Sequence, residues 1–489
     1  MPTVPVGYLV TTTVVAWCTL FALAPPRPRR SSPSNLSFLF GYLLNELPFV
    51  AFYWLLASTL LAFSQGDVDS PGGWAAFGVA VLATVGLVVV AWRGLRAGPA
   101  VDHALSEGLS AGWRTAIDTG MAARLRRRLP FARILFAPFP VRRHDVERVA
   151  NISYGDAGKR NLLDVYRHRS HPSGGPALVY LHGGAFRSGR KSREVRPLIY
   201  RLASQGWVCV SANYRLGPAV RFPDHLVDAK KVIAWVREHG QAYGADPAVV
   251  FVAGSSAGGH LAAMAALTPN DPAFQPGFER ADTSVTAAIC LYGYDGALDT
   301  NQRSPSSPQA RVRTDAPPFF VAHGDQDTVV LVEDARRFVQ RLGSISSNPV
   351  VYAELPGGAA RVRPVPFPPL RGGRRRDRGV RRLGPVAPEG TAGVARRAVH
   401  VLDGSTLITT LPTFCPVSTY LYASTIWSSG YRLSMSGLNS PDPINLLKYR
   451  ASSWPGVLGI ANLTFLPPSS GVMSAKIGFW DSGPRSDET

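Results

Sequence analysis

Residues 249–262 read VVFVAGSSAGGHLA, and their pattern is the most informative in the chain about its fold. An apolar run typical of a buried strand leads into Gly-Ser-Ser-Ala-Gly, and a helix-forming segment follows. In this setting the Gly-x-Ser-x-Gly motif predicts a strained turn, whose residues must be small because the strand and the helix crowd it. The turn exposes the Oγ of Ser256 at the start of the helix. We therefore interpret Ser256 as a nucleophile; a helix cap made of glycine and serine is the weaker alternative.

Apolar strand-like runs alternate with helical segments between residue 146 and about residue 358. Helical periodicity is clearest in 222–239, where apolar residues recur every three or four positions. The alternation predicts an α/β domain built on a mainly parallel sheet. The predicted strands are Arg148–Tyr154, Leu162–Tyr166, Ala177–Leu181, Val208–Asn213, Val249–Ala253, Val285–Leu291, Phe319–Ala322 and Val350–Leu355.

A second strand of this domain runs into His182-Gly183-Gly184. Acyl transfer needs fixed N–H donors for an oxyanion, and glycine lets the backbone approach a substrate closely. We expect the N–H groups of Gly183 and Gly184 on one side, and that of Ala257 on the other, to form an oxyanion hole. Alone, the His-Gly-Gly stretch would fit an ordinary turn equally well. Together with the motif at Ser256, it favours the catalytic interpretation.

A carboxylate is expected after the serine in chain order, because enzymes with this nucleophile motif place their acid there. The strand 319–322 runs into His-Gly-Asp-Gln-Asp, which brings two carboxylates to one turn. Asp327 is the better candidate to orient an imidazole. We expect Asp325 to be a turn residue.

Several further segments resemble the hormone-sensitive-lipase-type carboxylesterases. They are HGGAF at 182–186, GSSAGGHLA at 254–262, LLDVYRHR at 162–169, SANYRLGP at 211–218, FPDHLVDAKKVIAWV at 222–236, YGADP at 243–247 and HGDQD at 323–327. The N-terminal part looks like that of the membrane-associated mycobacterial lipases and esterases, and prenylcysteine methylesterases share a similar layout. The resemblance covers roughly residues 1–358. It implies an α/β-hydrolase fold and ester hydrolysis by Ser256, with Asp327 orienting a histidine and with no metal or cofactor.

Three apolar stretches precede this domain, at about 5–25, 43–63 and 74–92. Each is near the ~20 residues that cross a bilayer as a helix, so residues 1–96 are predicted to be an anchor of three transmembrane helices. Arginines follow the first and third stretches, whereas the second connection is acidic. Basic flanks mark the cytoplasmic side, so we expect a multi-pass membrane protein with a cytoplasmic catalytic domain. Buried core helices are the alternative.

Residues 97–145 form a basic, helix-like connector that contacts the inner leaflet, caps the active site or is simply solvated. The whole chain is basic, with 52 Lys and Arg against 33 Asp and Glu, but only six of the 52 are lysines. Arginine gathers beside the apolar segments and in 361–397, and this distribution argues against a nucleic-acid partner. The expected partners are an ester substrate and membrane lipids. The four cysteines are widely spaced and are read as buried free thiols.

The resemblance breaks just after Leu355-Pro356-Gly357, where the family carries its catalytic histidine. Eleven arginines crowd residues 359–398, and no histidine follows before His400. Shifting the reading frame by one base at codon 360 permits His-Ala-Phe followed by an amphipathic helix. We therefore interpret 359–399 as out of frame and the Ser/Thr-rich residues 400–489 as an overrun; a genuine appended domain is the alternative.

Other histidines must be weighed as substitutes for the missing base. His400 keeps the chain order of serine, acid and histidine, but it would need a long excursion of the chain. His182, His260 and His323 are expected to be structural. Without a base the chain would be a hydrolase-like protein with defective catalysis, and loss of the final helix would leave the edge of the sheet uncovered.

Overall fold

A computed structural model describes residues 5–25, 44, 48–109, 143–192, 196–298, 304–327, 329–356, 462–465 and 475–478. The chain divides into two units, Met1–Ser429 and Gly430–Thr489. In the second unit the described residues form an antiparallel pair of short strands, β9 (Asn462–Phe465) and β10 (Ala475–Gly478). The segment 359–399 and His400 lie outside the described residues.

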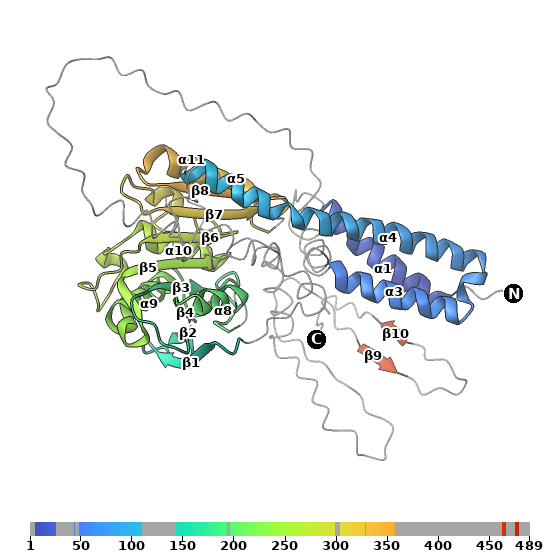
Figure 1. The fold of residues 1–489 in the computed structure, drawn as a ribbon, viewed down its shortest axis with the longest axis horizontal. Coiled ribbons are helices and arrows are strands. Elements are labelled where there is room, and N and C mark those ends of the chain that lie inside the picture. The colour runs from blue at the N-terminus through green and yellow to red at the C-terminus, as the bar shows by residue number, and fades with distance from the viewer. Residues whose placement is uncertain are drawn as a thin grey trace, which may run out of the picture. The chain divides into compact units, whose positions relative to one another are not determined.

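The first unit contains an eight-stranded sheet with the strand order β1-β2-β4-β3-β5-β6-β7-β8 (Figure 1). β1 pairs with β2 and β2 pairs with β4 in antiparallel fashion, and every other neighbouring pair is parallel. The mainly parallel α/β sheet and its eight predicted strands are therefore confirmed. The strands are β1 (Val146–Ser153), β2 (Leu162–His168), β3 (Gly175–Leu181), β4 (Val208–Ala212), β5 (Ala245–Ser255), β6 (Ala287–Leu291), β7 (Phe319–Gly324) and β8 (Val350–Leu355).

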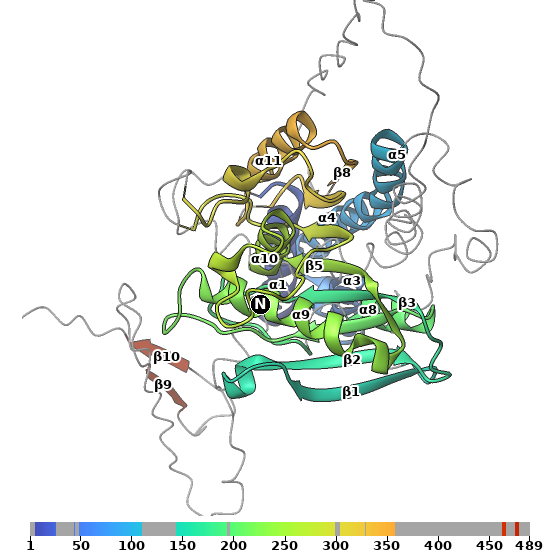
Figure 2. The same cartoon turned by 90° about the vertical axis from the view of Figure 1, so that its left-hand side faces the viewer.

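Helices cover both faces of the sheet, which is why its central strands are continuous apolar runs rather than alternating ones. One face packs against α8 (Arg196–Ser204) and α5 (Ala97–Leu109). The other packs against α9 (Asp224–His239), α10 (Ala257–Leu267) and α11 (Val332–Ile345). Seen along the sheet, α5 and α11 lie on opposite sides of β8 (Figure 2). The thiols of Cys209 and Cys290 are buried in these cores.

The helix α5 has a position that the sequence pattern did not predict. Ala97, Val101, Ala104 and Leu105 recur at helical spacing and are buried against the sheet. Near the end of α5, a Cβ on Gly108 would lie 2.9 Å from a side-chain carbon of Val351, so the helix approaches β8 closely. The first part of the expected connector is thus a core helix. It packs on one face of β8, the strand at the edge that we expected to be uncovered. The Arg-rich part, 110–142, lies outside the described residues.

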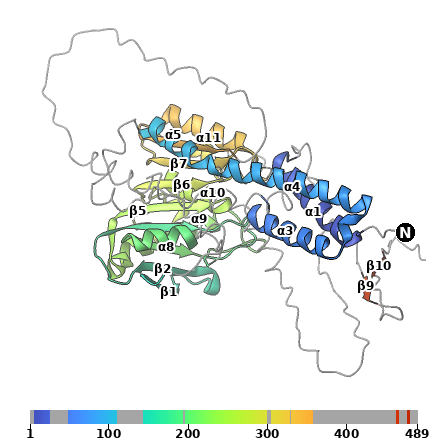
Figure 3. The same cartoon turned by 45° about the vertical axis from the view of Figure 1, so that its right-hand side comes forward.

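The N-terminal helices are α1 (Val6–Leu23), α3 (Pro48–Ser64) and α4 (Pro71–Leu95), and they pack on one another through a small apolar core. Large apolar side chains also point outward, among them Trp17, Trp54, Leu82 and Val88. Within the described residues, α1 and the continuous helical stretch Pro71–Leu109 are long and apolar enough to span a membrane, whereas α3 is shorter. Figure 3 shows α5 continuing the line of α4. Two apolar helices of spanning length are therefore present, not clearly three.

Candidate active site

Ser256 lies at the junction of β5 and α10, in a backbone conformation with φ 51°. A positive φ is costly for a residue with a Cβ, so the surrounding structure must hold it in place. The Ser256 N–H donates to the carbonyl of Leu291 at the end of β6 (3.0 Å), and the Ser256 carbonyl accepts from the N–H of His260 (3.0 Å). The strained turn predicted from the motif is therefore present and is tied to the neighbouring strand.

Glycines surround this turn because there is no space for a side chain. A Cβ on Gly254 would lie 2.1 Å from the carbonyl oxygen of Gly258, and one on Gly258 would lie 2.0 Å from that of Leu181. One on Gly259 would lie 2.8 Å from the Cα of Gly293. The small residues of the motif thus let the strand, the helix and the end of β3 meet at the serine.

The His-Gly-Gly loop starts beside this turn, because Leu181 at the end of β3 is paired with Gly254 of β5. Gly184 has φ 123°, and a Cβ there would lie 2.1 Å from the Ser188 carbonyl oxygen. The His182 ring stacks on Tyr214 at 4.4 Å between ring centroids, and the Tyr214 hydroxyl donates to the His182 carbonyl at 2.7 Å. The loop that carries Gly183 and Gly184 is thus fixed next to Ser256 and Ala257.

Asp327 follows β7, at the same carboxyl edge of the sheet. Its Oδ1 accepts from the N–H groups of Val329 (2.8 Å) and Val330 (2.9 Å), and its Oδ2 lies 3.6 Å from Nε2 of His323. Burial raises the pKa of Asp327, while His323 and the two amides act in the opposite direction. The Asp325 N–H donates to the Leu355 carbonyl of β8 at 3.1 Å, and the Asp327 N–H donates to the Gly324 carbonyl at 3.3 Å, which closes a turn around Asp325.

Three buried histidines near these loops each bond to a backbone carbonyl. Nδ1 of His182 bonds to Gly183, Nδ1 of His260 to Tyr294 and Nε2 of His323 to Val330, at 2.7, 2.7 and 2.8 Å. Burial lowers the pKa of His182 and of His260 to about 4, which suits a base at neutral pH poorly. These contacts are those expected of structural histidines.

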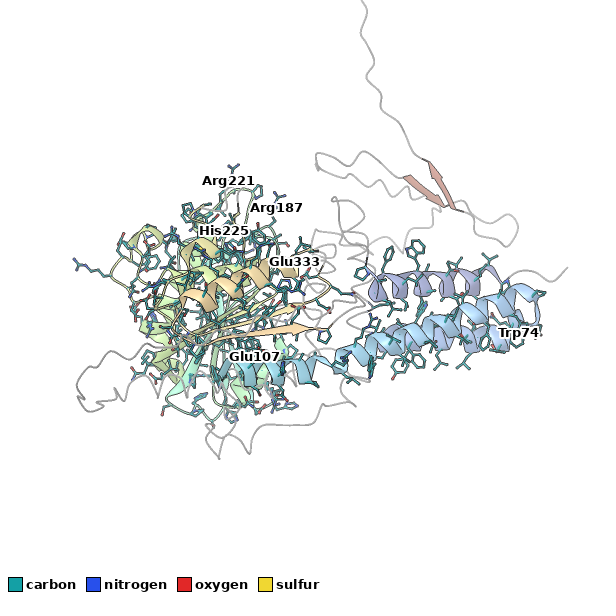
Figure 4. The ribbon with its side chains drawn as sticks, turned by 90° about the horizontal axis from the view of Figure 1, so that it is seen from above. Trp74, Glu107, Arg187, Arg221, His225 and Glu333 are labelled. Atoms are coloured by element: carbon teal, nitrogen blue, oxygen red, sulfur yellow. The ribbon has the colours of Figure 1, made fainter. Side chains whose placement is uncertain are left out.

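Contacts behind the site were not predicted from the sequence. The Tyr180 hydroxyl and the Ser255 Oγ lie 2.7 Å apart in the core, directly beside the turn. Phe186 contacts His225 at the start of α9, with ring centroids 5.0 Å apart. Arg187, Arg221 and His225 gather on one side of the domain (Figure 4). The aromatic residues in the segments SANYRLGP and HGGAF were the sequence feature from which packing around the glycine loop could have been predicted. Within the described ranges no cluster of His, Cys, Asp or Glu could hold a metal ion.

The buried histidines predict how stability depends on pH. The unfolded chain takes up protons near pH 6.5, whereas His182 and His260 stay neutral in the fold down to about pH 4. The contribution of these two histidines to the free energy of unfolding is therefore fully present above pH 6.5. It is lost as the pH falls toward 4, by on the order of 3 kcal/mol for each histidine. Thermal melting across this range should show a weaker decline in His260→Gln than in the parent, and no such change in the exposed control His103→Gln. Parallel profiles for all three proteins would contradict the prediction.

A nucleophile turn after one strand, a glycine loop after its neighbour and an acid loop two strands away meet at the carboxyl edge of a mainly parallel sheet. This arrangement defines an α/β hydrolase. The sequence model of the BD-FAE family matches residues 163–303. The probable carboxylic ester hydrolase LipM of Mycobacterium tuberculosis is 37% identical over 384 residues, which cover 72% of this chain and 87% of LipM. The esterase LipQ of the same organism is 36% identical over 301 residues, covering 56% of this chain and 71% of LipQ.

Among solved structures, Thermogutta terrifontis esterase 2 phosphoramylated by tabun is 26% identical, with 45% of this chain and 86% of that one covered and a TM-score of 0.39. The chain belongs to the α/β-hydrolase carboxylesterases related to the mycobacterial LipM and LipQ enzymes. It is by homology a carboxylic ester hydrolase.

Proposed function

We propose that the chain is built as a serine esterase in which Ser256 attacks the carbonyl carbon of a carboxylic ester. The observation that carries this proposal is the strained backbone of Ser256, with φ 51°, held between β5 and α10 beside the loop of Gly183 and Gly184. Attack forms a tetrahedral intermediate, whose oxyanion would accept hydrogen bonds from the N–H groups of Gly183, Gly184 and Ala257. Collapse of the intermediate releases the alcohol and leaves an acyl group on Ser256, which water then hydrolyses.

Proton transfer needs a histidine that Asp327 orients. Asp327 has one oxygen held by two backbone amides, which fixes the carboxylate for this task. His182, His260 and His323 each bond to a backbone carbonyl, so none of these three is proposed as the base. We propose that the base belongs at about position 360 and is lost through a shift of the reading frame. The alternatives are His400 as the base, or a hydrolase-like protein that does not catalyse.

Covalent labelling tests whether Ser256 is activated. A fluorophosphonate probe reacts with a serine whose proton can be removed, so an active chain should be labelled at Ser256 and Ser256→Ala should not. The same pair of proteins should differ in hydrolysis of short p-nitrophenyl esters. Hydrolysis retained in Ser256→Ala would overturn the assignment of the nucleophile, and a chain that is folded but inert to the probe would support the non-catalytic alternative.

Residues 1–96 are proposed to anchor this esterase in a membrane, with α1 and α4 as spans and α3 as a third, shorter one. The exposed apolar side chains of these helices support the proposal, since a helix surface of this kind is stable in lipid. Arg93 and Arg96 follow the apolar part of α4, and basic residues of this kind support a cytoplasmic location for the catalytic domain.

Two truncations separate the anchor from the catalytic domain. A chain that begins at Ala97 keeps α5 on β8 and is expected to be folded and soluble after carbonate washing, whereas the full chain should need detergent. A chain that begins at Arg143 is expected to aggregate, because it loses Val101 and Leu105 from the core, each worth about 1.5–3 kcal/mol. Sedimentation and circular dichroism measure both results. Equal solubility of the two truncations would show that α5 is dispensable, and membrane retention of the Ala97 chain would place the anchor elsewhere.

A further inference from the structure

The direction of α5 relates the anchor to the catalytic edge of the sheet. Gly108, near the end of α5, contacts Val350 and Val351 at the start of β8. The eleven steps from Ala97 to Gly108 span about 16 Å of helix, and the five steps from Val350 to Leu355 also span about 16 Å. α5 lies along β8 (Figure 1), so Ala97 lies level with the carboxyl end of the strand, and Ala97 and Leu355 share one buried core.

The end of α4 is therefore next to the carboxyl edge, because Ala97 begins two residues after α4 ends. Trp74 and Glu107 mark the two ends of this helical stretch (Figure 4). Charge supports the same placement. Arg93, in the last turn of α4, interacts electrostatically with Asp325, which follows β7. The Arg93 guanidinium also donates to the carbonyl of Leu23 at the end of α1, at 3.2 Å.

The exposed apolar residues of the catalytic domain lie on this edge too. Among the described residues between 143 and 356, the large hydrophobic side chains that are exposed are Leu298, Val329 and Leu331, at 36%, 45% and 42%. Leu298 follows β6, and Val329 and Leu331 follow β7 within four residues of Asp327, so all three belong to segments that leave the carboxyl edge of the sheet. We call these three residues the apolar rim. Exposed apolar residues that share one edge of a domain are candidates for an interaction surface, whereas scattered single ones are ordinary.

We propose that the carboxyl edge of the sheet faces the membrane surface from which α4 emerges, and that the apolar rim contacts lipid there. The occupant of the rim is a lipid surface, because α4 is continued by α5 and therefore brings the proposed anchor to this edge of the sheet. This inference rests on the proposed membrane anchor and the proposed esterase function, and it adds the class of substrate on which the esterase acts. An amphiphilic carboxylic ester, with its acyl chain in the bilayer, reaches Ser256 from the membrane without crossing water.

Lipid quenching of a site-specific fluorophore tests this orientation in the full chain. Val329→Cys is labelled with an environment-sensitive dye, in a background with Cys415→Ser, and is reconstituted into phosphatidylcholine–phosphatidylglycerol vesicles. The matched control is Ser173→Cys, because Ser173 is exposed and precedes β3 at the opposite edge. Lipids that carry a nitroxide on the headgroup should quench the Val329 label at least about threefold more than the Ser173 label, since an interfacial group lies within ~5–10 Å of the headgroups.

Equal quenching at the two positions, or stronger quenching at Ser173, would overturn the proposal. Leu298→Cys and Leu331→Cys repeat the measurement if the Val329 variant does not fold. The result does not depend on catalysis. If fluorophosphonate does not label Ser256 but the quenching difference is observed, the proposed esterase function is contradicted and the proposed orientation stands. If Ser256 is labelled but the quenching difference is not observed, the proposed orientation is contradicted and the proposed esterase function stands.

Discussion

The kcat/KM for p-nitrophenyl butyrate is expected to fall by about 10⁵-fold or more when Ser256 becomes alanine in a chain whose frame supplies a histidine near position 360. The nucleophile, the oxyanion donors and the base act as one unit, so loss of the nucleophile removes the covalent route altogether. Alanine keeps the Cβ that the turn already accommodates at φ 51°, so the fold should be unchanged. Initial rates at low substrate concentration and thermal melting measure the two effects.

Ser255→Ala is the matched control, because it removes a hydroxyl one residue away. The Ser255 Oγ is buried and lies 2.7 Å from the Tyr180 hydroxyl, so its loss leaves a buried polar group with one partner fewer. We expect a loss of stability of about 1–3 kcal/mol and kcat/KM within about threefold of the parent. The assignment fails if the two variants exchange these behaviours, with Ser255→Ala inactive and Ser256→Ala active.

Local patterns were sufficient to predict the sheet and the nucleophile turn. β6 (Ala287–Leu291) and residues 249–253 of β5 are continuous apolar runs, and such runs are read directly from the sequence when both faces of a sheet are covered. The glycines around Ser256 report a steric constraint that lies within a few residues, since Gly254 and Gly258 approach each other across the turn. Information of this kind is contained in a short window of sequence.

The position of α5 could not be predicted in the same way. Its buried face is made mostly of alanine and valine, and its partner β8 lies about 250 residues later in the chain. A small-residue face fits a solvated helix, a membrane-surface helix and a core helix equally well, so only the tertiary contact at Gly108 distinguishes them. The same limit applies to α1 and α4, whose length and apolar composition suit a membrane span and a core helix alike.

Restoring the reading frame at codon 360 is expected to raise kcat/KM for short esters by about 10³–10⁴-fold over the chain as written. The expectation follows from the state of the site. Ser256 is held in its strained turn and Asp327 is held by two amides, but His182, His260 and His323 are each bonded to a backbone carbonyl. A frame that reads His-Ala-Phe and then an amphipathic helix would add a base just after Leu355, at the edge where Asp327 lies. Resequencing codons 350–400 and assaying both proteins side by side make the measurement.

His400→Ala in the chain as written is the control that separates the two sources of a base. If the unrestored chain is active and His400→Ala abolishes that activity, then His400 serves Ser256 and the frame hypothesis is wrong. If His400→Ala changes nothing and the restored frame gains activity, the base belongs near position 360. A restored chain that folds with α5 still on β8, yet gains no activity, would rule out a base near position 360, and an unchanged His400→Ala variant would rule out His400 as well. The two results together would leave a protein that keeps the geometry of an esterase without its proton transfer.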